Sequence, residues 1–227
     1  MAFSLTYSQT GEGSALVLLH GNGEDRHYFD AQVPVLAQHF CVFAVDTRGH
    51  GQSPRGDAPF TLQQFAQDLA ALMDSLALPQ ADVLGFSDGG NIALLFALQY
   101  PQRVRRLIID GANLYPLGMK FPFWLAIWAA YAKACVKAWF DPGAKRSREM
   151  LALMARQPHI PPKALAKLTM PALVISGTRD MIRSRHTRLI ARSLGNAQLL
   201  WLAGSHFVAM EDPAAFNQAA LAFLQAL

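Results

Sequence analysis

The segment ADVLGFSDGGNIALLFALQ, residues 81–99, contains a short apolar run, a turn of small residues and a longer apolar stretch. Ala81–Phe86 is predicted to be a buried strand, and Asp88–Gln99, which ends before a proline, is predicted to be a helix. Between them the chain fits the motif G-x-S-x-G, in which a serine occupies a strained turn between a strand and a helix. Glycines two positions before and after Ser87 allow the strand and the helix to approach closely. The segment therefore predicts an exposed serine nucleophile at the end of a strand.

Short apolar runs, each followed by a turn and an amphipathic stretch, recur along the rest of the chain. The runs are rich in Val, Ile and Leu, which is typical of strands buried on both faces of a sheet. Because strands and helices alternate, the sequence predicts an α/β fold: a mainly parallel β-sheet flanked by helices. The expected strands are Ala15–Leu19, Cys41–Val45, Ala81–Phe86, Arg106–Ile109, Ala172–Ser176 and Gln198–Leu202. The expected helices are Tyr28–Gln38, Leu62–Leu76 with Thr61 as N-cap, Asp88–Gln99, Ser184–Leu194 and Pro213–Leu227.

One interval, residues 113–169, interrupts this alternation because it contains no convincing strand. Its most apolar part is Phe121–Phe140. Lys133 and Lys137 fall inside that part, so an uninterrupted membrane-spanning run of about 20 apolar residues is missing. We expect an amphipathic helical cap, and contact of its aromatic face with a membrane surface is an alternative. The expected organisation is one domain over 1–227, with a core of 1–112 and 170–227 and a cap at about 113–169.

A serine hydroxyl is a poor nucleophile at neutral pH and needs a neighbouring base. Among seven histidines, His206 is best placed, because it follows the last predicted strand and precedes the final helix. His20 and His50 lie beside glycines and are expected to hold their loops. A histidine base needs a carboxylate that orients it. Asp180, just after a predicted strand, is the expected carboxylate, and Asp110, at the end of the preceding strand, is the alternative.

Attack by serine creates negative charge on a carbonyl oxygen, and backbone N–H groups can stabilise that charge. The loop His20-Gly21-Asn22-Gly23 follows the first buried strand, and its glycines allow the backbone to turn sharply. We expect the backbone N–H groups of Asn22 and Asp88 to form this oxyanion hole. A phosphate-binding loop is the alternative interpretation, but the chain has no complete G-x-G-x-x-G and no G-K-[ST] pattern here.

The chain contains four blocks of sequence in a characteristic order: HGNG at 20–23, DTRGHGQS at 46–53, GFSDGG at 85–90, and the pair GTRD at 177–180 with GSHF at 204–207. With these blocks the chain resembles the α/β-hydrolase superfamily over nearly its whole length. The resemblance implies the α/β-hydrolase fold and a Ser87–Asp180–His206 catalytic triad in its usual chain order. It also implies that the second block, DTRGHGQS at 46–53, supports the site without taking part in catalysis. A serine at this position is unlike the dehalogenase and epoxide-hydrolase branches, whose nucleophile is aspartate.

The composition of the 227 residues, 52% hydrophobic and 16% charged, is that of a folded domain with a large core. Cys41 and Cys135 lie outside any metal-binding pattern, so neither a metal nor a cofactor is expected. The N-terminal residues lack a basic region followed by a long apolar run, so a cytoplasmic protein is expected. Basic residues concentrate after residue 100, but no nucleic-acid recognition motif accompanies them, so no nucleic-acid partner is expected. The oligomeric state is left open.

These residues together predict a serine hydrolase that cleaves a small or medium carboxylic ester through an acyl-enzyme. Phe86, Trp124 and Trp128 are expected to line an apolar pocket for the acyl group of a small-molecule substrate. A thioesterase or a C–C bond hydrolase acting on an anionic acyl substrate is one alternative, because the second half of the chain is basic. A non-catalytic ligand receptor of the same fold is another.

Overall fold

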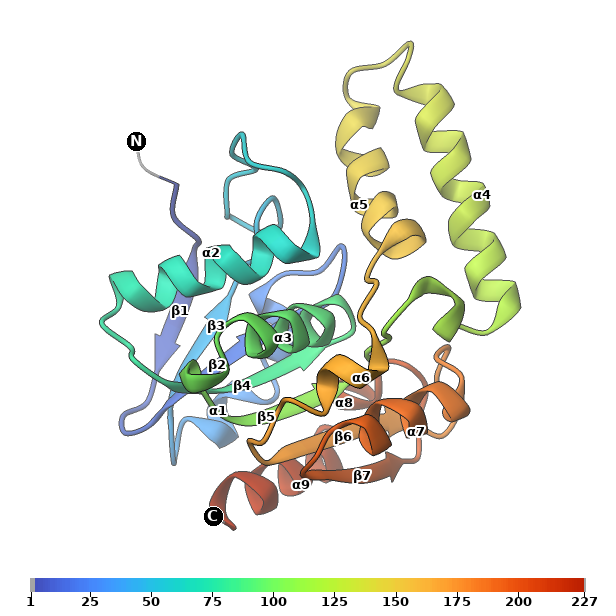
Figure 1. The fold of residues 1–227 in the computed structure, drawn as a ribbon. Coiled ribbons are helices and arrows are strands. Elements are labelled where there is room, and N and C mark those ends of the chain that lie inside the picture. Colours follow the sequence, from blue (N-terminus) through green and yellow to red (C-terminus); the bar gives the residue numbers. More distant parts are fainter. Residues whose placement is uncertain (1–2, 227) are drawn as a thin grey trace.

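A seven-stranded β-sheet forms the centre of the computed structural model, which describes residues 3–226 (Figure 1). Strand β1 pairs with β3 in antiparallel orientation, and the other neighbouring strands pair in parallel. This sheet, with helices on both sides, confirms the predicted α/β fold class. Across the sheet the order is β1 (Tyr7–Thr10), β3 (Cys41–Val45), β2 (Ala15–Leu19), β4 (Ala81–Phe86), β5 (Val104–Asp110), β6 (Ala172–Gly177) and β7 (Ala197–Leu202).

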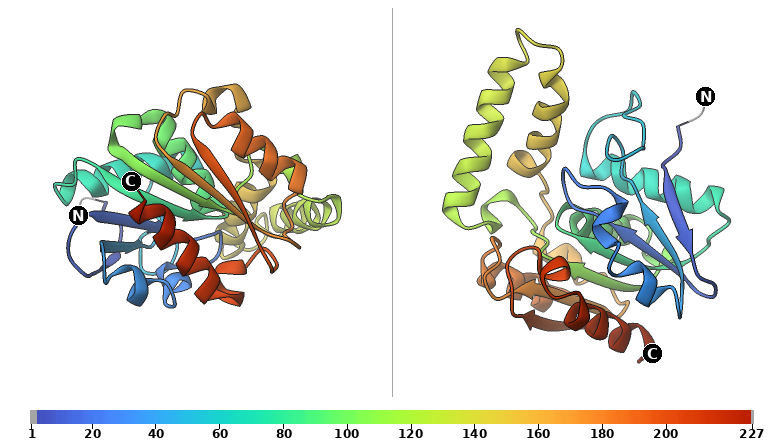
Figure 2. Two further views of the ribbon diagram at one scale, coloured as in Figure 1. Left: turned by 90° about the horizontal axis from the view of Figure 1, so that it is seen from below. Right: turned by 180° about the vertical axis from the view of Figure 1, so that it is seen from behind.

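Helices cover both faces of the sheet and create two separate cores (Figure 2). In β2, Val17 and Leu19 belong to one core, and Leu16 and Leu18 belong to the other. Successive side chains of a strand point to opposite faces, so burial of both faces explains why the strands are continuously apolar in sequence. The first core is covered by α2 (Leu62–Ser75), α3 (Asp88–Gln99) and α7 (Ser184–Ser193), and the second by α1 (Val33–Leu36), α8 (Val208–Glu211) and α9 (Pro213–Gln225).

The boundaries of most elements agree with the sequence-based prediction to within two residues. Helix α2 begins after Thr61, whose side-chain hydroxyl accepts a hydrogen bond from the Gln64 N–H at 3.1 Å, as expected of an N-cap. The final helix ends at Gln225, and Leu227, the last residue of the predicted helix, lies outside the described residues.

Two differences from the prediction occur near the N-terminus. The helix predicted over Tyr28–Gln38 is a 3-10 turn, η1 (Arg26–Phe29), followed by the short helix α1. Pro34 is the reason, because it lacks an N–H group and therefore fits only the first turn of a new helix. Strand β1 was not predicted, because it is an exposed, polar edge strand without an apolar pattern.

The segment between β5 and β6 contains a helical hairpin that projects away from the sheet (Figure 1). Its two long helices are α4 (Phe121–Lys137) and α5 (Ala144–Arg156), which pack against each other. The 3-10 turn η3 (Pro116–Gly118) precedes them, and the short helix α6 (Pro162–Leu165) follows. Within residues 3–226, no helix combines the length and the apolarity that a bilayer-spanning segment requires.

Candidate active site

Ser87 lies between β4 and α3, in a backbone conformation that is strained for a residue with a side chain. Its φ is 54° and its ψ is −117°, in the region that favours glycine. A Cβ atom on Gly85 would overlap the backbone of Gly89, and a Cβ atom on Gly89 would overlap the carbonyl of Leu19. The two glycines of the motif are therefore required by the close approach of β4, α3 and β2 around the serine.

His206 and Asp180 converge on Ser87 from the loops that follow β7 and β6. The Nε2 atom of His206 lies 3.0 Å from Ser87 Oγ, and its Nδ1 atom lies 2.7 Å from Asp180 Oδ1. Since a carboxylate accepts hydrogen bonds, Nδ1 carries the proton and donates it, which leaves Nε2 free to accept from the serine hydroxyl. The Asp180 carboxylate is itself held by donors from the Ile182 N–H at 2.8 Å and the Ser176 hydroxyl at 3.0 Å.

Asp110, the alternative carboxylate, takes no part in this chain of hydrogen bonds. Within the described residues neither of its carboxyl oxygens has a hydrogen-bond partner, although the side chain is fully buried. Burial, with the nearby charge of Asp180, raises the pKa of Asp110 well above its usual range. The structure thus brings Asp180, and not Asp110, against the histidine.

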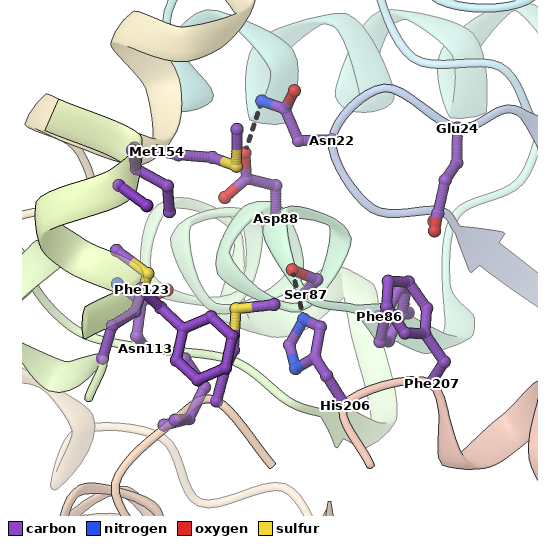
Figure 3. Close-up of a pocket in the computed structure, with 15 residues that line it drawn as sticks. Asn22, Glu24, Phe86, Ser87, Asp88, Asn113, Phe123, Met154, His206 and Phe207 are labelled. Carbon is purple, nitrogen blue, oxygen red and sulfur yellow. Dashed lines mark hydrogen bonds between the residues drawn. The ribbon is translucent and has the colours of Figure 1, made fainter. Parts of the chain in front are cut away.

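Two backbone N–H groups beside Ser87 are available to a ligand. Within the described residues, the N–H groups of Asn22 and Asp88 make no hydrogen bond. Asp88 is the first residue of α3, so its N–H has no partner inside the helix. The Asn22 side chain donates to Asp88 Oδ2 at 2.9 Å (Figure 3). It also donates to the Met150 carbonyl of α5 at 3.0 Å. This amide therefore joins the loop after β2 to both α3 and the helical hairpin.

His20 and His50 hold the loops around the site. The Nε2 atom of His20 accepts a hydrogen bond from the Thr47 N–H at 3.0 Å, and its Nδ1 atom lies 2.7 Å from the Gly21 carbonyl. His50 lies 3.1 Å from the Thr47 hydroxyl through Nδ1. Burial lowers the pKa of His50 to about 4, so this ring is neutral near pH 7.

A largely apolar cavity of about 260 Å³ opens above Ser87 (Figure 3). Phe86, predicted to line such a pocket, does so, and Phe207 lies beside it. Among the described residues that line the cavity there is no lysine or arginine, but there are two carboxyl groups, Glu24 and Asp88. The lining residues are Asn22, Glu24, Phe86, Ser87, Asp88, Asn113, Met119, Phe123, Ala126, Ile127, Met154, Met181, Ile182, His206 and Phe207.

Trp124 and Trp128 do not reach this cavity, which corrects the expectation that they line the pocket at Ser87. They line a separate groove formed by α4, the end of α5 and the segment around η3, beside Tyr115 and Arg156. The helical repeat is the reason: Phe123, Ala126 and Ile127 share one face of α4, and the tryptophans lie on another. The sequence shows which residues share a face of the helix through the spacing i, i+3 and i+4. Which of these faces lines the cavity depends on how α4 packs against α5.

Glu24 is a cavity residue that the sequence did not single out. Its Oε2 atom accepts a hydrogen bond from the Gly21 N–H at 3.0 Å, so the side chain braces the loop that carries Asn22. Burial raises the pKa of Glu24 to about 7, against the opposing effect of that hydrogen bond and of the charge of His206. The carboxyl group therefore changes its charge near neutral pH.

The raised pKa of Glu24 makes the stability of the protein depend on pH. Between pH 4.5 and 7 the folded state holds this proton and the unfolded state releases it, so the protonated group stabilises the fold at low pH and that contribution is lost as pH rises. Glutamine at this position does not titrate. As pH rises from 4.5 to 7, we therefore expect the free energy of unfolding of Glu24→Gln to increase by roughly 1–2 kcal/mol relative to that of the wild type, a figure that includes a reduction for solvent screening. Thermal unfolding of both proteins at a series of pH values measures the difference.

The exposed Glu12 provides the matched control, because Glu12→Gln removes the same charge from the surface. Its Tm should follow the wild-type pH profile. Parallel profiles for wild type and Glu24→Gln would show instead that Glu24 ionises as an ordinary surface carboxylate.

Comparison with known proteins places these features in a family. A family model described as alpha/beta hydrolase fold matches residues 14–159. The chain is 30% identical to human Serine hydrolase BPHL over 97% of its own length and 83% of that protein. It is 37% identical to an uncharacterized Mycobacterium tuberculosis protein over 103 residues, which span 45% of this chain and only 30% of that one.

Solved structures give the same result for the fold. A hydrolase from Pseudomonas aeruginosa PA01 superposes with a TM-score of 0.80, is 30% identical, and is matched over 97% of this chain and 94% of its own.

Proposed function

Because the chain belongs to the alpha/beta hydrolase fold family, we propose that it hydrolyses small or medium carboxylic esters with Ser87 as the nucleophile. The observation that carries this proposal is the unbroken hydrogen-bond chain from Ser87 through His206 to Asp180 at the floor of an apolar cavity. A hydroxyl, an imidazole and a carboxylate in this order perform acyl transfer on several unrelated folds.

The proposed reaction begins with attack of Ser87 Oγ on the ester carbonyl carbon. His206 Nε2 takes the hydroxyl proton and then delivers it to the leaving alcohol, which leaves an acyl group on the serine. Water, activated by the same nitrogen, attacks the acyl-enzyme, releases the acid and restores the serine hydroxyl. Asp180 keeps the imidazole in the required tautomer and stabilises its charged form. The N–H groups of Asn22 and Asp88 donate to the oxyanion.

The lining of the cavity supports a neutral, apolar acyl group. Its volume of about 260 Å³ lies at the lower end of small-molecule sites, and its walls are mainly apolar. A carboxylate on the acyl chain would meet Glu24 and Asp88 without a compensating cation. The cavity therefore favours an ester over the anionic acyl substrates that the basic second half of the chain had suggested.

We further propose that residues 113–169 act as a cap on a core formed by 1–112 and 170–227. Phe123 and Ile127 of α4 and Met154 of α5 form one wall of the cavity, so the hairpin would select the acyl group. The residues proposed for chemistry all lie outside this segment.

A panel of p-nitrophenyl esters tests the proposed substrate class. We expect kcat/KM to be highest for a short or medium neutral acyl chain and to fall for laurate. The p-nitrophenyl monoester of glutaric acid should react with a kcat/KM roughly tenfold or more below that of its methyl-capped counterpart, because its free carboxylate would leave water for a mainly apolar cavity without a compensating cation. Initial rates over a range of substrate concentrations separate kcat from KM.

The two faces of α4 provide the control for this panel. Ile127→Ala enlarges the cavity and should move the preference toward longer chains, whereas Trp124→Ala, from the face that lies outside the cavity, should leave it unchanged. Faster turnover of the anionic ester would favour the thioesterase or C–C hydrolase alternative. Tight ligand binding without turnover would favour a receptor.

A further inference from the structure

Helix α4 is apolar over most of its length, yet it lies almost entirely at the surface. Of its 17 residues, Ala134 is the buried one, and Lys133 and Lys137 are its charged ones. A helix that is apolar all round is normally buried. In Figure 1 α5 lies on the side of the sheet and α4 on the far side of the hairpin, and Figure 2 shows the same arrangement from behind.

Large exposed side chains form a continuous stripe along this helix, which we call the α4 stripe. Its members are spaced three or four residues apart and therefore share one face. The stripe continues into the turn between α4 and α5, where Trp139 and Phe140 are 79% and 82% exposed. The α4 stripe consists of Phe121, Leu125, Trp128, Val136, Trp139 and Phe140, with the small, exposed Ala132 between Trp128 and Val136.

Basic side chains lie on both helices of the hairpin: Lys120, Lys133 and Lys137 lie on or next to α4, whereas Lys145 and Arg146 lie on α5, and Arg146 donates to the Gly49 carbonyl at 2.9 Å. Between residues 120 and 149 the two acids are Asp141 and Glu149, and each is half-buried in an ion pair, with Lys137 at 3.4 Å and with Arg55 at 2.9 Å. The exposed bases of this segment are Lys120, Lys133, Lys137, Lys145 and Arg146. The apolar surface is therefore bordered by net positive charge.

We propose that the helical hairpin docks on an anionic lipid bilayer, with the α4 stripe in the interface and the flanking bases at the headgroups. Exposed tryptophan and phenylalanine beside lysines are the combination that binds the boundary between headgroups and acyl chains. A second copy of the chain would bring the same basic surface against itself, and repulsion between the two sets of lysines opposes that arrangement. Charge thus selects the lipid surface over self-association.

The docked orientation would bring the bilayer close to the cavity at Ser87. Phe123, Ala126 and Ile127, on another face of the same helix, line that cavity. Helix α4 would then form the partition between the lipid interface and the cavity. The docking itself needs no chemistry at Ser87, so its test does not depend on the proposed activity.

Sedimentation with vesicles made of equal parts phosphatidylglycerol and phosphatidylcholine tests the proposal. We expect the protein to bind these vesicles and not pure phosphatidylcholine vesicles, and to be released when about 1 M salt shortens the Debye length from about 10 Å to about 3 Å. Lys133→Gln with Lys137→Gln should weaken partitioning by about 30-fold, because each base near an anionic surface contributes about 1 kcal/mol. The double variant Trp139→Ala with Phe140→Ala should also weaken partitioning to these vesicles, although it leaves the charge of the protein unchanged.

The control is Lys163→Gln with Lys167→Gln, which removes the same charge from exposed positions around α6 and should change partitioning by less than about threefold. Because all these side chains are exposed, each variant is expected to keep the wild-type fold, and circular dichroism checks this. Absence of vesicle binding at low salt, or equal weakening by the control, would overturn the proposal. A dimer in sedimentation velocity that Trp139→Ala with Phe140→Ala dissociates, without vesicle binding, would identify a second copy as the occupant.

Discussion

Replacing Ser87 with alanine is expected to lower kcat for ester hydrolysis by about 10⁶-fold, because the substitution removes the proposed nucleophile. Residual turnover would come from the N–H groups of Asn22 and Asp88 and from substrate binding, which the substitution leaves in place. A fluorophosphonate probe should label the wild type once per chain and should not label the variant. Burst kinetics with an activated ester provide an independent measure, since the wild type should release one equivalent of alcohol rapidly if deacylation is slow.

Ser147, an exposed serine on α5, supplies the matched control for this variant. Ser147→Ala should retain both labelling and turnover. The Tm of Ser87→Ala should remain close to that of the wild type, because the substitution removes one oxygen and keeps the turn between Gly85 and Gly89. Labelling that persists in Ser87→Ala would disprove the assignment of the nucleophile.

Replacing Asp180 with asparagine is expected to lower kcat by about 10⁴-fold, whereas Asp110→Asn should lower it by less than about tenfold. The asparagine amide at position 180 would favour the wrong tautomer of His206, so that Nε2 could no longer accept the serine proton. Asp110 differs in two respects: burial already favours its neutral form, and it makes no hydrogen bond to the histidine. Steady-state kinetics of the two variants on one ester give the comparison.

The pair is informative because Asp110 ends β5, Asp180 lies in the loop just after the neighbouring strand β6, and both are buried. Near-ultraviolet circular dichroism checks that each variant keeps its packing. A larger loss of kcat in Asp110→Asn than in Asp180→Asn would show that Asp110, on the earlier strand, is the carboxylate that orients His206.

Local sequence was sufficient for the elements that carry Ser87. Strand β4 and helix α3 have the predicted boundaries, because a buried apolar run, two obligatory glycines and a proline after the helix act within a few residues of one another. The same holds for β2 and β3, which are buried on both faces. Strand β1 was missed because its polar residues pair at an edge, and only the partner strand β3 makes that segment extended.

The lining of the cavity could not be predicted in the same way. Phe86 adjoins the serine in the chain and was identified, but Trp124 and Trp128 were chosen for their size, and size carries no information about direction. The face of α4 that meets the cavity depends on how the hairpin packs. Glu24 was missed for a related reason, since its raised pKa results from burial by segments distant in sequence.

The sequence by itself determined the fold family, the order of the candidate catalytic residues and the turn that holds Ser87, because these depend on short-range patterns of apolar, small and turn-forming residues. The meeting of Ser87, His206 and Asp180 within hydrogen-bond distance depended on the parallel sheet, which brings the carboxyl ends of β4, β6 and β7 to one edge. Only the tertiary structure decided which side of α4 faces the cavity and which side remains an exposed apolar stripe, since a helix that is apolar all round has no preferred face until its neighbours are in position.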